Sequence, residues 1–468
     1  MGSIRKNRGS VTVFVSLMLA VLLFFFQAGL QSARSAFLRS QAEEALELAE
    51  YSVLSEYHRE LWERYGMFYL DLGYGGPGED TGYLKQRLRQ FLNENLPSGN
   101  AGQIQVERIS RATDGNGMAW YEQAVSCAKE QMGISFLEEA GDYERLGRQA
   151  EELQEEYAGA SSREQENLEE LRQRRAEEEA ESTPNPLSEL ESLKRGSILN
   201  LVLKEPGAVS GKKADLKGMP SKRSCIRGAG PRGKYAGTPG NDVFFHIYLL
   251  SVCSHGAEIL TGDRQPGSWL DYQAEYLIAG KDTDIANLES VCGRLLALRE
   301  GLNYMYLLSD GAKQAECQAL AALLVGVTLI PGLVEAVAQV LLLGWAFAES
   351  VLDVRLLLNG KSVAFWKGAD TWKLSLAQAL DLGNSLAAYD GREDRPGLRY
   401  RDYLGMLLAL TGRETKAMRG LDVVEGVIRG EPGGMYFRAD HCTDSFWAEA
   451  ELVQDRALRA RRWLCYEW

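Results

Sequence analysis

The sequence predicts an α+β, mainly α protein: an N-terminal transmembrane helix continuous with a long extended helix, small β elements, and a C-terminal helical domain. Three observations predict it. Val11–Leu30 is an uncharged apolar run, helical periodicity continues beyond it, and apolar-periodic segments separated by Gly and Asp fill the chain from residue 241 onward. With 45% apolar residues, a chain of 468 residues has ample material for a packed core.

The first element is Val11–Leu30, which follows the basic residues Arg5, Lys6 and Arg8. A helix of twenty residues spans about 30 Å, the thickness of a bilayer's hydrocarbon core. Basic residues stay on the cytoplasmic side, so we expect a single-pass cell-membrane protein with a cytoplasmic N-terminus and an extracytoplasmic bulk. Two alternatives are a cleaved secretory signal, for which residues 31–33 make a poor cleavage site, and a buried core helix.

Helical periodicity extends the first element to about Tyr65, where Gly66 ends it. Apolar residues recur at three- and four-residue steps, which gives this helix one face for burial. They are Leu46, Ala49, Val53, Tyr57 and Leu61.

A small α+β region follows the long helix. The sequence predicts a short strand over residues 67–72, a helix over Tyr83–Leu92, a strand over Gln103–Ser110 and a helix over Trp120–Met132. The second strand rests on alternation of apolar and polar residues.

Two segments of opposite charge form the middle of the chain. Residues 138–181 hold sixteen acidic residues against six Arg, and Gly159 interrupts a weak apolar seam. We expect a solvated, partly helical spacer, with a partner-binding coil as the alternative. Residues 194–234 hold eleven Lys and Arg against two acidic residues, among Gly, Pro and Ser, which predicts a flexible basic linker around one strand over Ser197–Leu203. Its charge suggests contact with the acidic helices, anionic lipid or wall polymer.

The sequence of residues 241–468 predicts a mainly helical domain. Its most apolar stretch, Cys317–Ala348, is cut by Pro331-Gly332 and contains Glu335, so a buried helical hairpin is favoured over a membrane hairpin. Asn359-Gly360 between apolar runs predicts a β-hairpin. The remaining expectations are helices over Thr371–Ala388, Tyr400–Leu410 and Thr415–Arg429, an edge strand over Met435–Ala439, and a helix over Thr443–Leu464.

These elements divide the chain into six regions. They are a cytoplasmic basic N-terminus (1–10), a transmembrane anchor (11–30), an extended helix plus small α+β region (31–137), an acidic helical spacer (138–182), a basic Gly/Pro-rich flexible linker (183–240), and a mainly helical domain (241–468) with its apolar helical hairpin (317–348).

Composition excludes several classes of function. A net charge of −13 argues against nucleic acid as a partner. The seven cysteines form no CxxC pair and no zinc-type spacing, and a Cys442–Cys465 disulfide stays open. Gly228–Tyr235 resembles a phosphate-binding loop, but Tyr235 replaces the hydroxyl residue that holds magnesium and Pro231 removes a backbone donor. We therefore expect no nucleotide, cofactor, metal or catalytic residues.

The four histidines support the same expectation. They are His58, His246, His255 and His441. Their spacing does not build a metal site, so we expect ordinary capping, buried or exposed imidazoles.

Two stretches carry a resemblance to a known family. They are RGSVTVFVSLMLAVLLFFF with LSEYHRELWERYGMFYLDLGYG, and YQAEYLIAGKDTDIANL with REGLNYMYLLSD and WAFAESVLDVRLLLNG. They resemble the uncharacterised DUF5702 family of Firmicutes (Gram-positive) membrane-anchored proteins, which implies no catalytic residues. The N-terminal layout is also similar to the TadE and TadG pseudopilins of tight-adherence pili. Arg8-Gly9 fits a prepilin-type junction with Ser10 as the new first residue, but Phe14 stands where those pilins carry Glu.

The favoured function is a non-enzymatic, membrane-anchored, extracytoplasmic structural or assembly protein of the cell envelope. The finer expectation is an accessory or minor pilin-like component of a tight-adherence pilus or secretion system, with membrane lipid and other envelope or pilus assembly proteins as partners. The alternative is an exported ligand-binding or enzymatic domain with a pocket among the helices of residues 271–310. Its candidate residues are Glu275, Asp284, Asn287 and Arg299, polar groups embedded between apolar segments.

Overall fold

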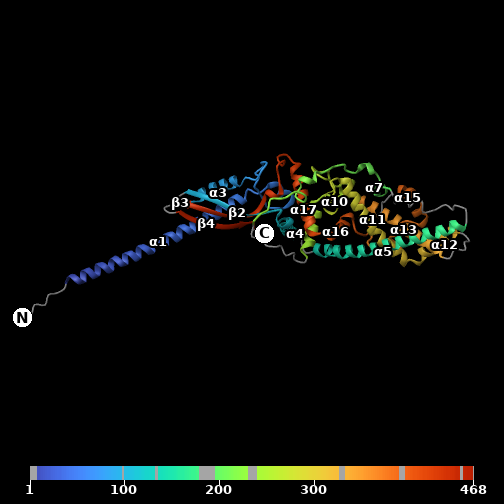
Figure 1. The fold of residues 1–468 in the computed structure, drawn as a ribbon, viewed down its shortest axis with the longest axis horizontal. Helices are drawn as coiled ribbons and strands as arrows, with labels where there is room; N and C mark the ends of the chain where they lie inside the picture. The colour runs from blue at the N-terminus through green and yellow to red at the C-terminus, as the bar shows by residue number, and fades with distance from the viewer. Residues whose placement is uncertain are drawn as a thin grey trace, which may run out of the picture.

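The computed structural model of the chain describes residues 8–96, 100–131, 135–178, 196–229, 240–325, 332–388, 396–453 and 457–466. It is mainly α-helical with one small antiparallel sheet, so the predicted fold class is confirmed. Figure 1 shows helix α1 (Arg8–Leu54) projecting as a rod from one end of an elongated body. The sheet and α3 (Thr81–Asn95) lie where α1 enters the body, and most of the other helices lie toward the far end.

Helix α1 has a bare half and a packed half. Every residue from Val11 to Leu30 is exposed, whereas one face is buried from Ala42 onward. Two segments of the described chain are long and apolar enough to cross a membrane, Val11–Leu54 and Asn241–Thr261, and the second is mostly buried inside the body. The bare half of α1 is therefore a possible membrane anchor.

The prediction that the first helix continues to Tyr65 is wrong, because the helix breaks before that residue. Helix α1 ends at Leu54, and a separate helix α2 (Arg59–Tyr65) begins after His58, whose side chain accepts a hydrogen bond from the Leu61 amide. The break redirects the chain, so that Leu61 and Tyr65 join the main core while α1 packs on the sheet. Gly66 ends α2 in a left-handed conformation with φ 64°, which glycine adopts without steric cost.

The sheet has β3 (Cys442–Val453) at its centre. Strand β2 (Asn100–Arg111) pairs with one side, and β4 (Ala457–Cys465) and the short β1 (Leu70–Asp71) pair with the other, all antiparallel. Helix α3 (Thr81–Asn95) packs beside α1, and both share one apolar cluster with the sheet. The predicted strand over Gln103–Ser110 and the helix over Tyr83–Leu92 are thus confirmed.

The C-terminal prediction is wrong. The predicted helix over Thr443–Leu464 is the β3–β4 hairpin, and the predicted edge strand over Met435–Ala439 forms no strand. Phe446, Ala448, Ala450 and Leu452 are buried at alternate positions, which is the period of a strand with one face on a core. Burial against α1 and α3 therefore outweighs the helix propensity of the Ala and Glu residues between them.

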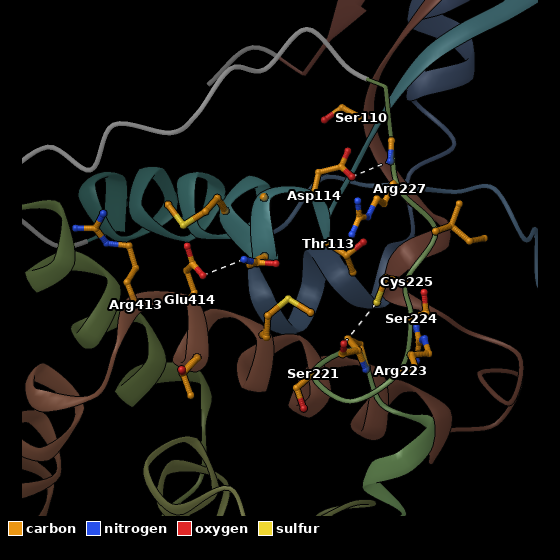
Figure 2. A pocket seen from close by; sticks show the side chains of 18 of the residues that line it. Ser110, Thr113, Asp114, Ser221, Arg223, Ser224, Cys225, Arg227, Arg413 and Glu414 are labelled. Atoms are coloured by element: carbon orange, nitrogen blue, oxygen red, sulfur yellow. Dashed lines mark hydrogen bonds between the residues drawn. The ribbon is translucent and has the colours of Figure 1, made fainter.

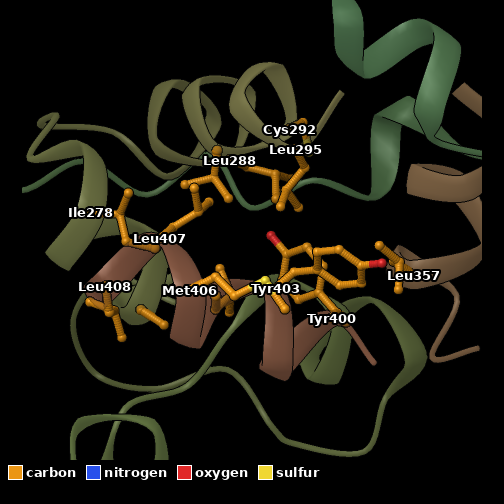
Figure 3. Packing of buried hydrophobic residues seen from close by; sticks show 14 of the residues in the cluster. Ile278, Leu288, Cys292, Leu295, Leu357, Tyr400, Tyr403, Met406, Leu407 and Leu408 are labelled. Carbon is orange, nitrogen blue, oxygen red and sulfur yellow. The ribbon is translucent and has the colours of Figure 1, made fainter. Parts of the chain in front are cut away.

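The rest of the body is a helical assembly, as predicted. Its helices are α4 (Asp114–Gln131), α8 (Asn241–Val252), α9 (Gly256–Thr261), α10 (Gln273–Ala279), α11 (Asp284–Ser309), α12 (Gly311–Val325), α13 (Leu333–Leu358), α14 (Leu376–Leu380), α15 (Leu382–Ala388), α16 (Tyr400–Leu410) and α17 (Arg413–Arg429). Figure 3 shows the apolar interior where Leu288 and Leu295 of α11 face Tyr400 and Met406 of α16.

Helices α12 and α13 pack against each other, and α13 is buried over most of its length against α5 (Ser135–Glu178) and α11. This burial agrees with the favoured helical hairpin; its turn, residues 326–331, lies outside the described chain. Asn359-Gly360 does not make the predicted β-hairpin. It ends α13, with Gly360 at φ 72°, because the left-handed glycine that suits a hairpin turn also suits a helix C-terminus.

The acidic region is more ordered than its composition predicts. Helix α5 runs for 44 residues through Gly159 without a break, and it packs on α11, α13 and α16. Tyr143, Ala150 and Tyr157 are buried. The solvated, interrupted spacer is therefore wrong for this stretch, because a few large side chains at helical spacing bury one face of an otherwise acidic helix.

The described part of the basic region, residues 196–229, lies against the body. Its predicted strand is a short helix, α7 (Ile198–Val202), and Lys212 and Ala214 exchange backbone hydrogen bonds with residues 282–284. Composition predicts a flexible linker because the segment has few apolar residues of its own. Buried carboxylates elsewhere in the chain, among them Asp422, Glu425 and Asp440, hold it instead. Residues 179–195 and 230–239 lie outside the described chain.

Candidate functional site

A cleft of about 1260 Å³ lies where the start of α4, the segment 220–228 and the start of α17 meet (Figure 2). Three parts of the chain that are distant in sequence therefore form one concave surface. The lining residues are Ser110, Thr113, Asp114, Gly115, Asn116, Met118, Pro220, Ser221, Arg223, Ser224, Cys225, Ile226, Arg227, Gly228, Gly412, Arg413, Glu414, Thr415 and Met418.

A left-handed turn shapes the α4 side of the cleft. Gly115, Asn116 and Gly117 have φ values of 62°, 59° and 81°, a conformation that favours Gly and Asn. The Asn116 amide donates a hydrogen bond of 2.9 Å to the Glu414 carboxylate on α17. A Cβ at Gly117 would lie 3.3 Å from Ala417, so the glycine allows α4 and α17 to approach closely.

Asp114 joins the cleft's α4 wall to the segment 220–228. Its two carboxylate oxygens accept hydrogen bonds of 2.8 Å from the backbone amides of Arg111 and Gly228, as Figure 2 shows for the latter. A carboxylate with both oxygens bound to amides is a structural clamp, and it is poorly placed to act as a general base.

Arg223 fixes the other end of the segment. Its guanidinium contacts the Glu425 and Asp440 carboxylates at 2.6 Å, and Arg438 adds a second cation at 2.9 Å from Asp440. Burial alone would raise the pKa of Asp440, but hydrogen bonds from Arg438, the Ile226 amide and Arg223 outweigh it and lower the pKa. Asp440 is therefore ionised at neutral pH, and it anchors the basic segment.

A buried basic pair lies behind the cleft. The Lys416 ammonium contacts the Nε2 atom of His246, and both side chains are nearly inaccessible. Burial lowers the pKa of Lys416 to about 8, and burial together with the Lys416 charge lowers the pKa of His246 to about 3. Neither residue lines the cleft, so this pair is a feature of the core.

The remaining groups that line the cleft are a thiol and several polar side chains. Burial raises the pKa of the Cys225 thiol, which reduces its thiolate fraction at neutral pH. Ser224, Arg227 and Thr415 offer exposed polar side chains that suit contact with a polar partner. Within the described residues, no group of three or more His, Cys, Asp or Glu side chains is arranged to hold a metal ion.

The structure places the four sequence-predicted pocket residues in the core, each in a different set of hydrogen bonds. Glu275 accepts from the Gly256 amide and the Tyr400 hydroxyl, at 2.7 and 2.8 Å, and burial raises its pKa. Asp284 accepts from Ser210 and from two backbone amides, and Thr283 rather than Asp284 caps α11.

The other two predicted residues are also used within the core. Asn287 exchanges hydrogen bonds with the backbone of Lys281. Arg299 contacts the Asp353 carboxylate at 2.9 Å and also donates to Asn303, Tyr403 and the Phe365 carbonyl. These partners bind the polar groups of Asp284, Asn287 and Arg299 and one oxygen of Glu275, whose Oε2 atom is buried without a hydrogen-bond partner among the described residues. Contacts within the core therefore account for most of the polar groups that stood out in the sequence of residues 271–310.

Other sequence expectations have mixed outcomes. His58 and His255 cap helices, and His246 and His441 are buried. In the described part of the chain no disulfide joins Cys442 to Cys465, and Cys465 pairs opposite Ser445 across the sheet. Gly228 and Ala229 of the phosphate-loop-like motif are described, and the rest of that motif lies outside the described residues.

The cleft itself was not anticipated from the sequence. Arg223 is separated from Glu425 and Asp440 by about two hundred positions, and ordinary charged residues at such distances give no local signal. The Asp-Gly-Asn-Gly run at residues 114–117 is the one feature that points to an unusual backbone there.

The fold and the cleft define a mainly helical protein with an exposed apolar N-terminal helix and a small sheet at its base. A family model matches residues 176–453, more than half of the chain, and the chain belongs to that family, the family of unknown function DUF5702. No curated protein and no solved structure matches the chain.

Proposed function

We propose that this protein is a non-enzymatic, membrane-anchored, extracytoplasmic structural or assembly protein. The N-terminus lies in the cytoplasm, α1 crosses the membrane once, and the body lies outside. The observation that carries the proposal is the two-part character of α1: residues 11–30 are exposed and apolar on every side, and residues 42–54 are built into the body. Lipid is the environment that such a bare apolar helix needs.

The orientation rests on charge. Arg5, Lys6 and Arg8 precede the apolar run within a short tail, which favours retention of that tail in the cytoplasm. Between Leu30 and Ala42 the helix is largely exposed and carries Arg34 and Arg39. At about 1.5 Å per residue, this stretch holds the body roughly 15–20 Å from the membrane surface.

The finer proposal is an accessory or minor pilin-like component of a tight-adherence pilus or secretion system. Its support is the layout of a long N-terminal helix whose second half packs on a small antiparallel sheet. Such a layout lets one helix serve as both membrane anchor and assembly rod, so its partners are membrane lipid and other envelope proteins. The Gly9-Ser10 junction fits this similarity, and Phe14, at the place of the usual Glu, departs from it.

The same proposal assigns no reaction to the protein. Asp114, Glu414 and Arg223 line the cleft, yet each already serves a structural contact. A general base needs a carboxylate or imidazole within reach of a substrate proton, and these groups are engaged by backbone amides, by the side-chain amide of Asn116 and by ion pairs. The cleft therefore fits a surface for a polar partner better than a catalytic centre.

Cysteine labelling in intact cells tests the orientation. Met435→Cys places a thiol at a position that is 64% exposed on the body, and Ser3→Cys places one in the N-terminal tail. With a membrane-impermeant maleimide, we expect labelling of the first variant without lysis and of the second only after lysis, above the wild-type background. The reverse pattern, with the body protected until lysis, would refute the proposed topology.

A further inference from the structure

One ionisable residue of α1 lies on the otherwise apolar face that packs on the sheet. Glu50 is fully buried, with 0% of its surface exposed, and neither carboxylate oxygen has a hydrogen-bond partner among the described residues. A buried, unpaired carboxylate costs several kcal/mol if it is ionised, so its protonation state matters to the packing around it.

The surroundings of Glu50 are apolar except for two groups. The faces of α1, α3 and β3 that meet here consist of Leu46, Ala49, Val53, Leu84, Leu88, Leu92, Phe446, Ala448, Ala450 and Leu452. The charged neighbours are Glu47 on α1 and Arg462 on β4, which form an ion pair of 2.7 Å at the rim of the cluster. The Nε atom of Arg462 is also buried without a partner in the described part of the chain.

We propose that Glu50 is a proton-operated latch between the membrane helix α1 and the sheet of the body. In its protonated form Glu50 is neutral and compatible with the apolar cluster. When it loses the proton, the new charge must draw Arg462 away from Glu47, or the contact between α1 and β4 must loosen. The latch goes beyond the proposed function, because it regulates the joint between rod and body and does not depend on which side of the membrane the body occupies.

The direction of the pH effect follows from linkage. Burial raises the pKa of Glu50 from 4.5 to about 8, and Arg462 opposes this shift only partly. The packed state therefore holds its proton over a range in which an unpacked α1 releases it. Packing is strongest below about pH 4.5, weakens by about tenfold in the equilibrium constant per pH unit up to about pH 8, and changes little above that.

Hydrogen exchange on the full-length protein in detergent micelles tests the latch. Exchange of the α1 amides of residues 42–54 is measured between pH 5.5 and 8.5 and corrected for the intrinsic pH dependence of exchange. We expect wild-type protection to fall about a hundredfold between pH 5.5 and 7.5. The variant Glu50→Gln, which stays neutral, keeps high protection at every pH, whereas the control Glu44→Gln, at an exposed position of the same helix, retains the pH dependence.

Two results would overturn the latch. One is the same pH profile in wild type and Glu50→Gln, and the other is protection in Glu50→Gln that is lower than wild type throughout, which would show that the ionised carboxylate supports the packing. Glu50→Met provides a second neutral variant if the Gln amide disturbs folding. A flat, high profile in Glu50→Met supports the latch, and a wild-type profile contradicts it.

Discussion

Arg299 and Asp353 form an ion pair of 2.9 Å in which both side chains are completely buried. Lys367 contacts the same carboxylate at 2.7 Å and also binds Glu349, so two cations and two anions share one interior site between α11 and α13. Burial alone would raise the pKa of Asp353, but Lys367 and Arg299 outweigh it and lower the pKa. The core thus depends on complete charge pairing.

Asp353→Asn should destabilise the fold strongly. The substitution removes one anion and leaves Arg299 and Lys367 buried with too little negative charge, which costs about 3–5 kcal/mol in the free energy of unfolding. Arg461→Gln is the matched control, because its ion pair with Glu449 is 60% exposed on the Arg side and should change stability by less than about 1 kcal/mol. Urea unfolding in detergent micelles measures both; equal effects would contradict the role given to the buried network.

Two substitutions of glycine by alanine should change the stability of the fold in opposite directions. A Cβ at Gly301 of α11 would lie 2.7 Å from the Leu153 backbone of α5, so Gly301→Ala should cost about 1–3 kcal/mol through overpacking. Gly159 of α5 has nothing within 4 Å of its Cβ position, so Gly159→Ala should stabilise by about 0.5–1 kcal/mol through helix propensity. Thermal unfolding of both variants checks the close contact of α5 and α11, and a neutral Gly301→Ala would argue against it.

His246 should make the fold sensitive to acid. Its pKa is lowered from 6.5 to about 3, so the unfolded chain binds a proton that the folded chain does not. The neutral imidazole therefore makes its whole contribution to the free energy of unfolding above about pH 6.5, and this contribution is lost as the pH falls toward 3. In His246→Gln, which can still accept from Lys416, the acid-side loss should be shallower by about 1.4 kcal/mol per pH unit. Urea unfolding from pH 7 to 4.5 measures the slopes, and parallel curves would exclude this role.

Arg223 should hold the basic segment on the body. Arg223→Gln removes the contacts to Glu425 and Asp440, so the segment should detach and expose its Lys and Arg residues to protease. We expect trypsin cleavage at residues 217–227 to speed up about tenfold or more, in line with a loss of at least about 1.4 kcal/mol. Lys222→Gln, at an exposed neighbouring position, serves as control. Equally slow cleavage in both variants would show that the segment is held by other contacts.

Local patterns predicted the elements whose signal lies within the element itself. The apolar run of α1, the alternation at Ile104 and Val106 of β2, and the helix over Tyr400–Leu410 were all predicted correctly. Errors arose where partners distant in sequence decide the conformation. Phe446 and Ala448 become strand residues because they join the apolar cluster that α1 and α3 also form. Helix α5 continues through Gly159 because Tyr143 and Tyr157 are buried against other helices.

The cleft could not be predicted for the same reason. Asp114 meets Gly228, and Arg223 meets Glu425, only after α4, the basic segment and α17 have packed together. Conversely, Glu275 and Arg299 stood out as polar residues in apolar surroundings, but a sequence cannot distinguish a binding residue from a buried one whose partners lie far along the chain. Glu50 gave no signal either, because a Glu in an amphipathic helix is usually taken to face water.

The central claim is that the first apolar helix stays in the membrane and holds the body outside it. Fractionation of cells that make the untagged chain, followed by mass determination of its N-terminus, tests this claim most directly. We predict recovery in the membrane fraction with residues 11–30 retained, starting at Met1 or Gly2 for a plain anchor or at Ser10 for pilin-type processing. Full-length protein in the soluble fraction, or a chain that starts near Arg34, would contradict the account.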